Sequence, residues 1–348
     1  MMFSVVIPVH NGEQFIEECL ESAVEQVKGI DGAEIIIVEN GSTDRTAEIC
    51  DRICAGETCI RVIHEGAIGL YLARQVGIKA SKGDYILALD SDDRLMDGML
   101  GRLKEIIEDF KTQGVRPDIL LYGAADMDNP QKRLTVLPFE SLKLYKGEET
   151  RVFKEVLCQG DAINAMWIKC ISRDIAYIDR ELKGLNYGED LFQTAVYLDR
   201  AESVVYLDEA LYLYRVNASS LSASYNKAYL DNQKFVWNEL DELIAKWNEP
   251  SFAEIVDKRK ALTCAIAVVK IMHSSLSLHE KKKKFLELFS DDFYKDNYKN
   301  GLPEFAPLEE CVVYDTMLKD NALVELLGAA FWHDSKERIK KVIRGNGI

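Results

Sequence analysis

Three aspartates directly follow an apolar segment and form the clearest candidate site of the sequence. The segment Tyr85–Leu89 has the length and apolar character of a buried strand, and Asp90, Ser91, Asp92 and Asp93 come next. Side chains on extended backbone alternate between two faces, so Asp90 and Asp92 are predicted to point the same way. Two such carboxylates would bind a hard cation such as Mg²⁺ or Mn²⁺, and the cation would hold phosphate oxygens. The alternative is a polar turn in which Asp92 or Asp93 caps a following helix.

A second pair of acidic residues, Glu189 and Asp190, follows Gly188 and precedes the helical pattern of Leu191–Leu198. One interpretation is a helix start, because negative side chains are favoured at helix N-termini. A carboxylate at a helix N-terminus can also act as a general base. The two interpretations are compatible, so Asp190 is a candidate base.

The first hundred residues alternate apolar strand patterns with helical patterns, and these elements must position the acidic residues. Strands are predicted at Phe3–Val9, Glu34–Val38, Ile60–Ile63 and Asp84–Leu89, and helices at Glu13–Val27, Gly69–Ala80 and between Ser42 and Cys54. Such alternation predicts a parallel sheet covered by helices on both faces. Ligands of these sheets bind beyond the carboxyl ends of the strands. The four strand ends are followed by His10-Asn11-Gly12, Glu39-Asn40-Gly41, His64-Glu65-Gly66 and Asp90-Ser91-Asp92.

The sequence lacks the glycine-rich loops that cradle phosphates with backbone amides. The first turn, Pro8–Glu13, contains no G-x-G-x-x-G pattern of a nicotinamide-type site. No G-x-x-x-x-G-K-[S/T] loop is present either. Bound phosphates would therefore need a metal, which agrees with the carboxylates that follow Leu89.

Five segments, in this order, resemble the signatures of the family 2 glycosyltransferases. They are Val5–Gly12, Val38–Asp44, Ala73-Arg74, Asp90–Asp93 and Gly188–Asp190. The resemblance covers residues 3 to about 220 and implies an α/β fold called GT-A, with a Rossmann-like, mostly parallel mixed sheet flanked by helices. It also implies inverting transfer of a sugar from a nucleotide-sugar donor, usually a UDP-sugar, with a divalent metal. The implied acceptor is a glycan or a lipid-linked saccharide in bacterial surface polysaccharide synthesis.

Carried over position by position, the resemblance assigns the nucleoside end of the donor site. The backbone of Pro8, Val9 and His10 would line the nucleoside pocket, and Glu39 would hydrogen-bond the base. Arg74 would approach the base or the phosphates, and a solvated or ion-paired arginine is the alternative. His10 stands where the family commonly has tyrosine, and Glu39 where it commonly has aspartate.

The diphosphate end of the donor is assigned to the aspartate segment and to a later arginine. Asp90 and Ser91 would lie near the ribose, and Asp92 would ligate the metal on the diphosphate. Tyr214–Ser220 resembles a further family segment, in which Arg215 meets the diphosphate. A purely structural arginine is the alternative at that position.

The catalytic roles fall on the later acidic pair. Inversion by direct displacement needs a base on the acceptor hydroxyl and stabilisation of the departing diphosphate. The resemblance makes Asp190 the base, with Glu189 beside it, while Asp92 and Arg215 would support the leaving group. Trp167 would stack on an acceptor sugar, and a core or hinge tryptophan is the alternative.

Two domains are predicted. A GT-A domain spans residues 1–224, with a nucleotide-binding half at about 1–100 and an acceptor-side half at 101–224. Its second half adds strands at Asp118–Tyr122, Val204–Leu207 and Leu211–Tyr214. Residues 225–348 are predicted to form a helical subdomain with helices at Tyr229–Trp247, Phe252–His273, Glu280–Phe289 and Tyr314–Trp332. Lys281–Lys284 is predicted to be a solvated helix face.

Composition limits the partners. The chain has 348 residues and a net charge of −15, which argues against nucleic-acid binding because that function needs a basic surface. No apolar run reaches the roughly 20 residues that span a bilayer, and the N-terminus has no basic residue of a signal peptide. Eight cysteines without a C-x-x-C pair indicate reduced, buried thiols and a cytoplasmic location.

Peripheral membrane contact is predicted for the C-terminal segment 331–348. This segment carries five Lys or Arg residues against two acids. Ile339, Val342 and Ile343 share one face of a helix. A basic amphipathic helix can lie on an anionic membrane surface. The alternative is a terminal helix that packs on the protein.

Two other functions compete with glycosyl transfer. A catalytically inactive relative would bind a nucleotide sugar or a glycan as a module, yet Asp90, Asp92 and Asp190 are all present. A nucleotidyltransferase would need a glycine-rich first loop with a basic residue, and Asn11-Gly12-Glu13 provides neither. The sequence therefore favours an active glycosyltransferase.

Overall fold

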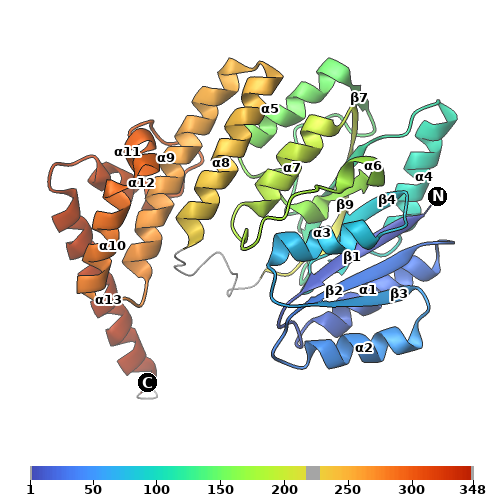
Figure 1. The fold of residues 1–348 in the computed structure, drawn as a ribbon, viewed down its shortest axis with the longest axis horizontal. Helices are drawn as coiled ribbons and strands as arrows, with labels where there is room; N and C mark the ends of the chain where they lie inside the picture. The colour runs from blue at the N-terminus through green and yellow to red at the C-terminus, as the bar shows by residue number, and fades with distance from the viewer. Residues whose placement is uncertain (1, 217–227, 346–348) are drawn as a thin grey trace. The chain divides into compact units, whose positions relative to one another are not determined.

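The computed structural model describes residues 2–216 and 228–345, with side chains up to residue 336 (Figure 1). The chain divides into two compact units, residues 1–218 and 219–348. The domain boundary predicted at residue 224 lies outside the described residues. The helical character predicted for the C-terminal part is confirmed.

Unit 1 is built on a mixed sheet, which has nine strands within the described residues. They are β1 (Phe3–Val9), β2 (Glu34–Asn40), β3 (Ile60–Glu65), β4 (Tyr85–Ala88), β5 (Arg94–Leu95), β6 (Ile119–Asp126), β7 (Leu144–Lys146), β8 (Lys169–Ser172) and β9 (Ser203–Tyr214). Their order is β3-β2-β1-β4-β8-β6-β9-β5, and β7 also pairs with β9. The first four strands are parallel, whereas β8 is antiparallel to β4 and β6. The predicted mixed α/β sheet is confirmed.

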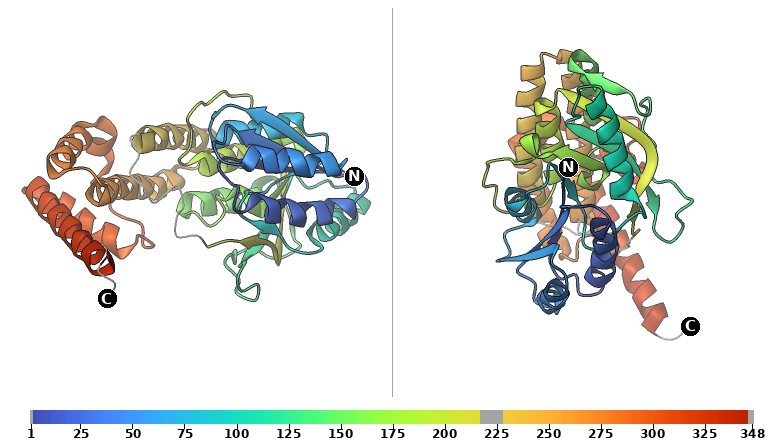
Figure 2. Two further views of the ribbon diagram at one scale, coloured as in Figure 1. Left: turned by 90° about the horizontal axis from the view of Figure 1, so that it is seen from below. Right: turned by 90° about the vertical axis from the view of Figure 1, so that its right-hand side faces the viewer.

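Helices cover both faces of this sheet, as Figures 1 and 2 allow the reader to follow. Those of unit 1 are α1 (Ile16–Lys28), α2 (Thr46–Gly56), α3 (Leu70–Ala80), α4 (Met99–Thr112), α5 (Arg151–Gln159), α6 (Arg173–Ala176) and α7 (Glu189–Arg200). Ile35 and Ile37 of β2 join the large core with α1, α2 and α4, while Ile36 and Val38 pack with Ala73 of α3. A strand buried on both faces carries a continuous apolar run.

The helix α3 approaches the sheet most closely at Gly77. A Cβ atom at this position would lie 2.4 Å from Cγ1 of Val6 and 3.2 Å from Cγ2 of Val38. Only the missing side chain of glycine allows such an approach. The contact fixes the height of α3 above β1 and β2, and Arg74 lies one turn earlier on the same helix.

The second half of unit 1 departs from the predicted elements in two respects. The strands predicted at 204–207 and 211–214 are parts of one strand, β9. The exposed Asp208 and the partly exposed Glu209 lie inside this strand and do not interrupt it. Different parts of β9 pair with β5, β6 and β7, so the pairing continues across this polar step. The short strands β5, β7 and β8 were not predicted.

Unit 2 is helical throughout the secondary structure described for it. Its helices are α8 (Ala228–Trp247), α9 (Pro250–His273), α10 (Leu278–Ser290), α11 (Asp292–Asn297), α12 (Leu308–Met317) and α13 (Ala322–Gly345). The helix α9 packs against each of the others, and its buried residues form the centre of the unit's core. Within the described residues, none of the helices combines the length and the apolar character needed to cross a membrane.

One prediction in unit 2 is wrong, and another is confirmed only at the exposed residues Lys282 and Lys283. The single helix predicted at 314–332 is interrupted between α12 and α13, where the polar run Lys319-Asp320-Asn321 forms a turn. The predicted solvated face Lys281–Lys284 includes Lys281, which is fully buried. Its Nζ donates to the carbonyl of Met272 at 2.8 Å and to Oδ1 of Asp334 at 2.7 Å. A buried ammonium group is tolerated because it is paired and hydrogen-bonded.

Candidate active site

The loops after β1 and β2 are joined by hydrogen bonds at the carboxyl edge of the parallel strands. The amide of Asn11 donates to Oγ of Ser42 at 3.0 Å, and the amide of Thr43 donates to Oδ1 of Asn11 at 2.8 Å. Gly41 has φ +69°, and a Cβ there would lie 2.5 Å from the amide nitrogen of Ala67. The two loops and the segment after β3 therefore form one connected edge, as the parallel order predicts.

Glu39 is buried at this edge, at the end of β2. Its Oε1 accepts a hydrogen bond from the amide of Ser42 at 2.6 Å, and its Oε2 lies 3.5 Å from Nδ1 of His64. Burial alone would raise the pKa of Glu39, but the Ser42 hydrogen bonds and the His64 charge outweigh burial and lower it. The other nitrogen of His64, Nε2, lies 2.9 Å from Oδ1 of Asp51, and this contact raises the pKa of His64. Glu39 is thus held ionised beside a histidine.

His10 is exposed where β1 ends, directly after Pro8 and Val9. Its Nδ1 lies 2.9 Å from the carbonyl oxygen of Asn40, so Nδ1 must donate. Its Nε2 lies 3.2 Å from Nδ2 of Asn11. The imidazole is therefore fixed in place by the two loops that are predicted to line a nucleoside pocket.

The three aspartates lie in a turn rather than on extended backbone. The strand β4 ends at Ala88, and the amide of Asp93 donates to the carbonyl of Asp90 at 3.1 Å to close the turn. The extended backbone, from which Asp90 and Asp92 were predicted to point the same way, therefore does not reach these residues. The capping alternative is wrong, because α4 begins at Met99 with Gly98 before it.

Asp93 and Arg215 hold this turn against the end of β9. Asp93 is buried and accepts hydrogen bonds from the hydroxyl of Tyr212 and the amide of Arg215, both at 2.7 Å. Burial, with the nearby charge of Asp90, raises the pKa of Asp93 to about 8. The Nε of Arg215 donates to the carbonyl of Asp92 at 2.8 Å, and its Nη2 donates to Oε2 of Glu18 at 2.6 Å. Arg215 therefore binds the turn through its backbone and its side chain.

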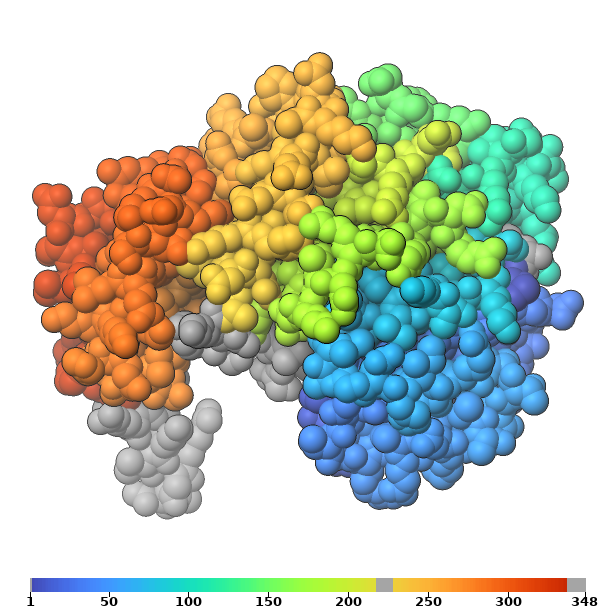
Figure 3. Space-filling model, viewed as in Figure 1, coloured from blue at the N-terminus to red at the C-terminus, as the bar shows by residue number. Residues whose placement is uncertain are grey.

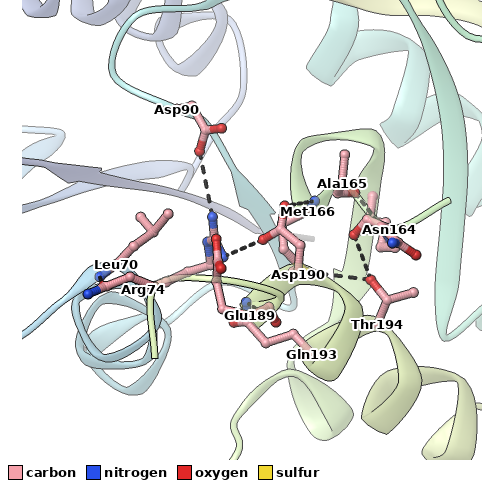
Figure 4. A network of polar contacts seen from close by, with 12 residues as sticks. Leu70, Arg74, Asp90, Asn164, Ala165, Met166, Glu189, Asp190, Gln193 and Thr194 are labelled. Atoms are coloured by element: carbon pink, nitrogen blue, oxygen red, sulfur yellow. Dashed lines mark hydrogen bonds and ion pairs between the residues drawn. The ribbon is translucent and has the colours of Figure 1, made fainter. Parts of the chain in front are cut away.

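Arg74 brings the two predicted acidic sites together (Figure 4). Its guanidinium is only 1% exposed; Nη1 donates to Oδ1 of Asp190 at 2.9 Å, and Nη2 lies 3.6 Å from Oδ1 of Asp90. The ion-paired alternative for Arg74 is therefore observed. Burial raises the pKa of Asp90 to about 6, although the charge of Arg74 opposes this shift. One buried cation thus bridges a carboxylate from the donor-side turn and one from α7.

Asp190 lies in the first turn of α7, and Gly188 precedes that helix with φ +81°. The second carboxylate oxygen of Asp190, Oδ2, accepts a hydrogen bond from the amide of Met166 at 3.4 Å. Burial, together with the charge of Asp190, raises the pKa of Glu189 to about 7. The pair therefore combines an oriented carboxylate with one that exchanges its proton near neutral pH.

Trp167 lies directly after this contact, in a short 3₁₀ turn, η2 (Met166–Ile168). Its ring stacks on Tyr212 at 4.8 Å and on Tyr214 at 5.3 Å between centroids. It also packs against the core and remains partly exposed. Trp167 therefore contributes to the core, as the alternative expected, although it is not fully buried. Its stacking on an acceptor sugar remains a prediction.

A metal ion at this site would need some of its coordinating atoms from a bound molecule or from water. Among the described residues, no group of three or more His, Cys, Asp or Glu side chains is placed to hold a metal ion. In the aspartate turn, Asp93 is buried with two hydrogen bonds and Asp90 faces Arg74. The partly exposed Asp92, on a backbone held by Arg215, fits a hard cation that takes its other ligands from phosphates and water.

Sequence reasoning missed three polar residues of this region. Glu18 binds Arg215, and Gln193 accepts a hydrogen bond from Nε2 of Gln75 at 3.1 Å behind Arg74. Lys169 is buried beside the turn that precedes Trp167. A lysine within the apolar run Met166–Ile171 was a usable signal, because lysine is almost never fully buried without a partner.

In the space-filling view, the acceptor-side segments of unit 1 lie against its nucleotide-binding segments (green against blue in Figure 3). The contact from Arg74 to Asp190 joins these halves across 116 positions of the sequence. The site therefore combines a loop edge at the strand ends, an aspartate turn and an oriented carboxylate pair. Such an arrangement suits binding of a nucleotide diphosphate next to a general base.

Comparisons with known proteins agree with this arrangement. Residues 4–167 match the family described as Glycosyl transferase family 2. EpsJ of Bacillus subtilis (strain 168), described as an uncharacterized glycosyltransferase, is 32% identical over 66% of this chain and 65% of EpsJ. EpsH of the same organism, described as a putative glycosyltransferase, is 25% identical over 89% of this chain and 90% of EpsH.

A solved structure shows the same fold. S. aureus TarS, residues 1–349, in complex with UDP-GlcNAc has a TM-score of 0.54 with this chain. The two chains are 19% identical, and the match covers 86% of this chain and 89% of that of TarS. The mixed sheet and the helical C-terminal part are therefore features of a known fold.

Proposed function

We propose that this chain, which belongs to glycosyl transferase family 2 and has the GT-A fold, transfers a sugar from a UDP-sugar to a saccharide or lipid-linked acceptor. The transfer inverts the anomeric carbon and serves surface polysaccharide synthesis. One observation carries the proposal: Arg74 links Asp90 of the donor-side turn to Asp190 of α7. The UDP-GlcNAc complex of TarS, a protein with the same fold, supports a nucleotide-sugar donor.

The donor would lie along the carboxyl edge of the parallel strands. Glu39 and the fixed imidazole of His10 would face the base, and Asp90 with Ser91 would bind the ribose. The backbone of Pro8 and Val9 would form the floor of the nucleoside pocket. Glu39 and His10 are already held by their hydrogen bonds, so little ordering of these side chains is needed when the donor binds.

Asp190 would take the proton from the acceptor hydroxyl. As that oxygen forms its bond to the anomeric carbon from one side, the bond to the diphosphate breaks on the other, and the electron pair leaves with the diphosphate. The Arg74 guanidinium and the Met166 amide each hold one oxygen of Asp190. They would fix the direction in which the base accepts its proton.

The leaving group would be received at the aspartate turn. Asp92 would hold a Mn²⁺ or Mg²⁺ ion, which when bound supplies positive charge to the departing diphosphate. Arg215 keeps the backbone of this turn in place and carries its own charge beside it. Trp167 would offer its ring to the acceptor sugar.

A screen of nucleotide sugars tests the function. The full chain is incubated with Mn²⁺, a set of UDP-, GDP- and dTDP-sugars, and simple glycosides as acceptors, and release of free nucleotide is measured. We expect release from at least one UDP-sugar, increased by an acceptor. Binding of UDP without release from any donor would contradict catalysis and would instead support a nucleotide-sugar-binding module.

A further inference from the structure

Lys169, at the first position of β8, is 1% exposed. A buried ammonium group is costly unless its hydrogen bonds are satisfied. Its Nζ donates to three consecutive carbonyl oxygens, those of Ile163 at 2.6 Å, Asn164 at 3.2 Å and Ala165 at 2.5 Å. Because an ammonium group has three N–H donors, each donor has one acceptor. The side chain of Lys169 therefore binds all three carbonyl groups of the turn 163–165 through one ammonium group.

The same turn is also held by α7. Oγ1 of Thr194 donates to the carbonyl of Asn164 at 2.9 Å. Thr194 lies one helical turn after Asp190, and Figure 4 shows Asn164 and Ala165 on the side of α7 that carries both residues. The turn is thus clamped by the ammonium group of Lys169 together with the first part of α7.

Met166 and the candidate acceptor-binding residue Trp167 follow this turn directly. The amide of Met166 donates to Oδ2 of Asp190 at 3.4 Å, and Trp167 then stacks on Tyr212 and Tyr214. A displacement of residues 163–165 would move both the amide that orients Asp190 and the ring of Trp167. Among the described residues, the side chain of Lys169 forms no hydrogen bond to the Met166 amide or to Trp167.

We propose that Lys169 is a positioning residue, whose ammonium group fixes the turn 163–165 and thereby sets the orientation of Asp190 and the place of Trp167. The roles of Asp190 and Trp167 in transfer rest on the proposed function, whereas the positioning itself does not.

Burial and the charge of Asp190 act in opposite directions on the ammonium group of Lys169. Burial lowers the pKa of Lys169 to about 7, while the carboxylate of Asp190 favours the charged form and Arg74 disfavours it. The hydroxyl of Tyr122 donates to the carbonyl of Lys169 at 3.2 Å and adds no charge. A neutral amine would have two N–H donors for three carbonyls, so the turn is fully satisfied by the ammonium form alone.

A spectroscopic test follows the turn without requiring activity. The full chain is labelled with 5-fluorotryptophan, its four tryptophans give four fluorine resonances, and Trp167→Phe assigns the one of interest. Lys169→Met is expected to shift or broaden the Trp167 resonance. Lys281→Met is the matched control, because Lys281 is equally buried and also donates to a backbone carbonyl, but in unit 2. We expect the control to leave the Trp167 resonance unchanged.

An unchanged Trp167 resonance in folded Lys169→Met would overturn the proposal. If Lys169→Met does not fold, Thr194→Val decides, because it removes the hydrogen bond that α7 donates to the same turn, with little change in volume. The Trp167 resonance must then move in Thr194→Val, and a resonance that stays in place would contradict the clamp.

Kinetics test the link to transfer. Lys169→Met should lower turnover by roughly tenfold or more, since a misplacement of about 1 Å in a reacting group can cost about 10²-fold. The affinity for UDP, measured by calorimetry, should not change. Wild-type turnover in Lys169→Met would contradict the positioning role. A wild-type chain that turns over no nucleotide sugar would instead overturn the proposed function, and the fluorine result would still decide the positioning.

Discussion

Arg74 shows how far residue types alone can describe this site. Asp90, Asp92 and Asp190 could be singled out from the sequence because acidic residues follow an apolar strand and open a helix. The pairing of Asp90 and Asp190 with Arg74 could not be predicted, since Arg74 lies 116 positions from Asp190 in the sequence. The burial of Asp93, which depends on Tyr212 of β9, is likewise set by tertiary contacts.

The pKa of Glu189 leads to a prediction on stability. Burial, with Asp190, raises this pKa from 4.5 to about 7, so the ionised form is disfavoured in the folded chain. Ionisation of Glu189 therefore lowers the free energy of unfolding. This loss of stability is absent below pH 4.5, where the carboxyl is protonated in both the folded and the unfolded chain, and it is complete above about pH 7.

Replacing Glu189 with glutamine should therefore raise the free energy of unfolding on the order of 1–3 kcal/mol at pH 8. The gain should shrink steadily as the pH falls toward 4.5. Urea unfolding, followed through the fluorine signal of Trp167, measures both values. A gain that is equal at the two ends of the range would show that ionisation of Glu189 is not its cause.

Asp92 gives a prediction on the metal. Asp92→Asn should remove the gain in UDP affinity that Mn²⁺ provides, because an amide cannot replace the charge of a carboxylate. Calorimetric titration of UDP with Mn²⁺, and again with a chelator, measures this gain. Asp97→Asn, an exposed aspartate of the following loop, is the control and should retain it. If Asp92→Asn also retains the gain, the metal is held elsewhere.

At the scale of elements, the strands β1 to β4 and the helices α3 and α7 were predicted to within two residues at most ends. The apolar runs of β1, β2 and β4 are continuous because both faces of these strands are buried. The strands β5, β7 and β8 escaped prediction because they have two to four residues and owe their conformation to the strands beside them. The aspartate turn was misjudged for a related reason: its conformation depends on Tyr212 and Arg215 from β9 and the residues after it.

The close approach of α3 to the sheet can be tested at Gly77. Gly77→Ala would place a Cβ 2.4 Å from Val6, which must force α3 away from β1. Overpacking of this kind costs about 1–3 kcal/mol, and it should also weaken transfer because Arg74 moves with the helix. Thermal unfolding and turnover measure the two effects.

Gly101→Ala serves as the matched control. Gly101 also lies in a helix of unit 1, α4, and nothing lies within 4 Å of the Cβ that alanine would add. Alanine is a better helix former than glycine by about 1 kcal/mol, so this change should be neutral or stabilising. Equal stability losses in both variants would contradict the proposed packing role of Gly77.

At the scale of the whole molecule, the partition into a GT-A unit and a helical unit was predicted from the change of pattern near Lys227. The membrane contact predicted for 331–348 remains a prediction. Phe331 and Trp332 in α13 are 52% and 74% exposed, and the basic residues of the sequence follow them. The side chains beyond residue 336 lie outside the described residues.

Sedimentation with anionic liposomes tests this contact. Changing Lys340, Lys341 and Arg344 together to glutamate should abolish binding, because attraction to anionic lipid is worth about 1 kcal/mol per basic residue. Lys282→Glu with Lys283→Glu, on exposed positions of α10, is the control for added negative charge. Full recovery of the unchanged chain in the supernatant at low salt would rule the contact out.

Asp190 is the proposed base of the glycosyl transfer, and its role can be measured directly. The most direct measurement compares Asp190→Asn with the unchanged chain, using the UDP-sugar found in the screen, for both UDP affinity and turnover at saturating donor and acceptor. Asp109→Asn, an exposed aspartate of α4, controls for the loss of one carboxylate. We predict unchanged UDP affinity and a loss of turnover of roughly 10²-fold or more in Asp190→Asn alone. Near-normal turnover in Asp190→Asn would contradict the account.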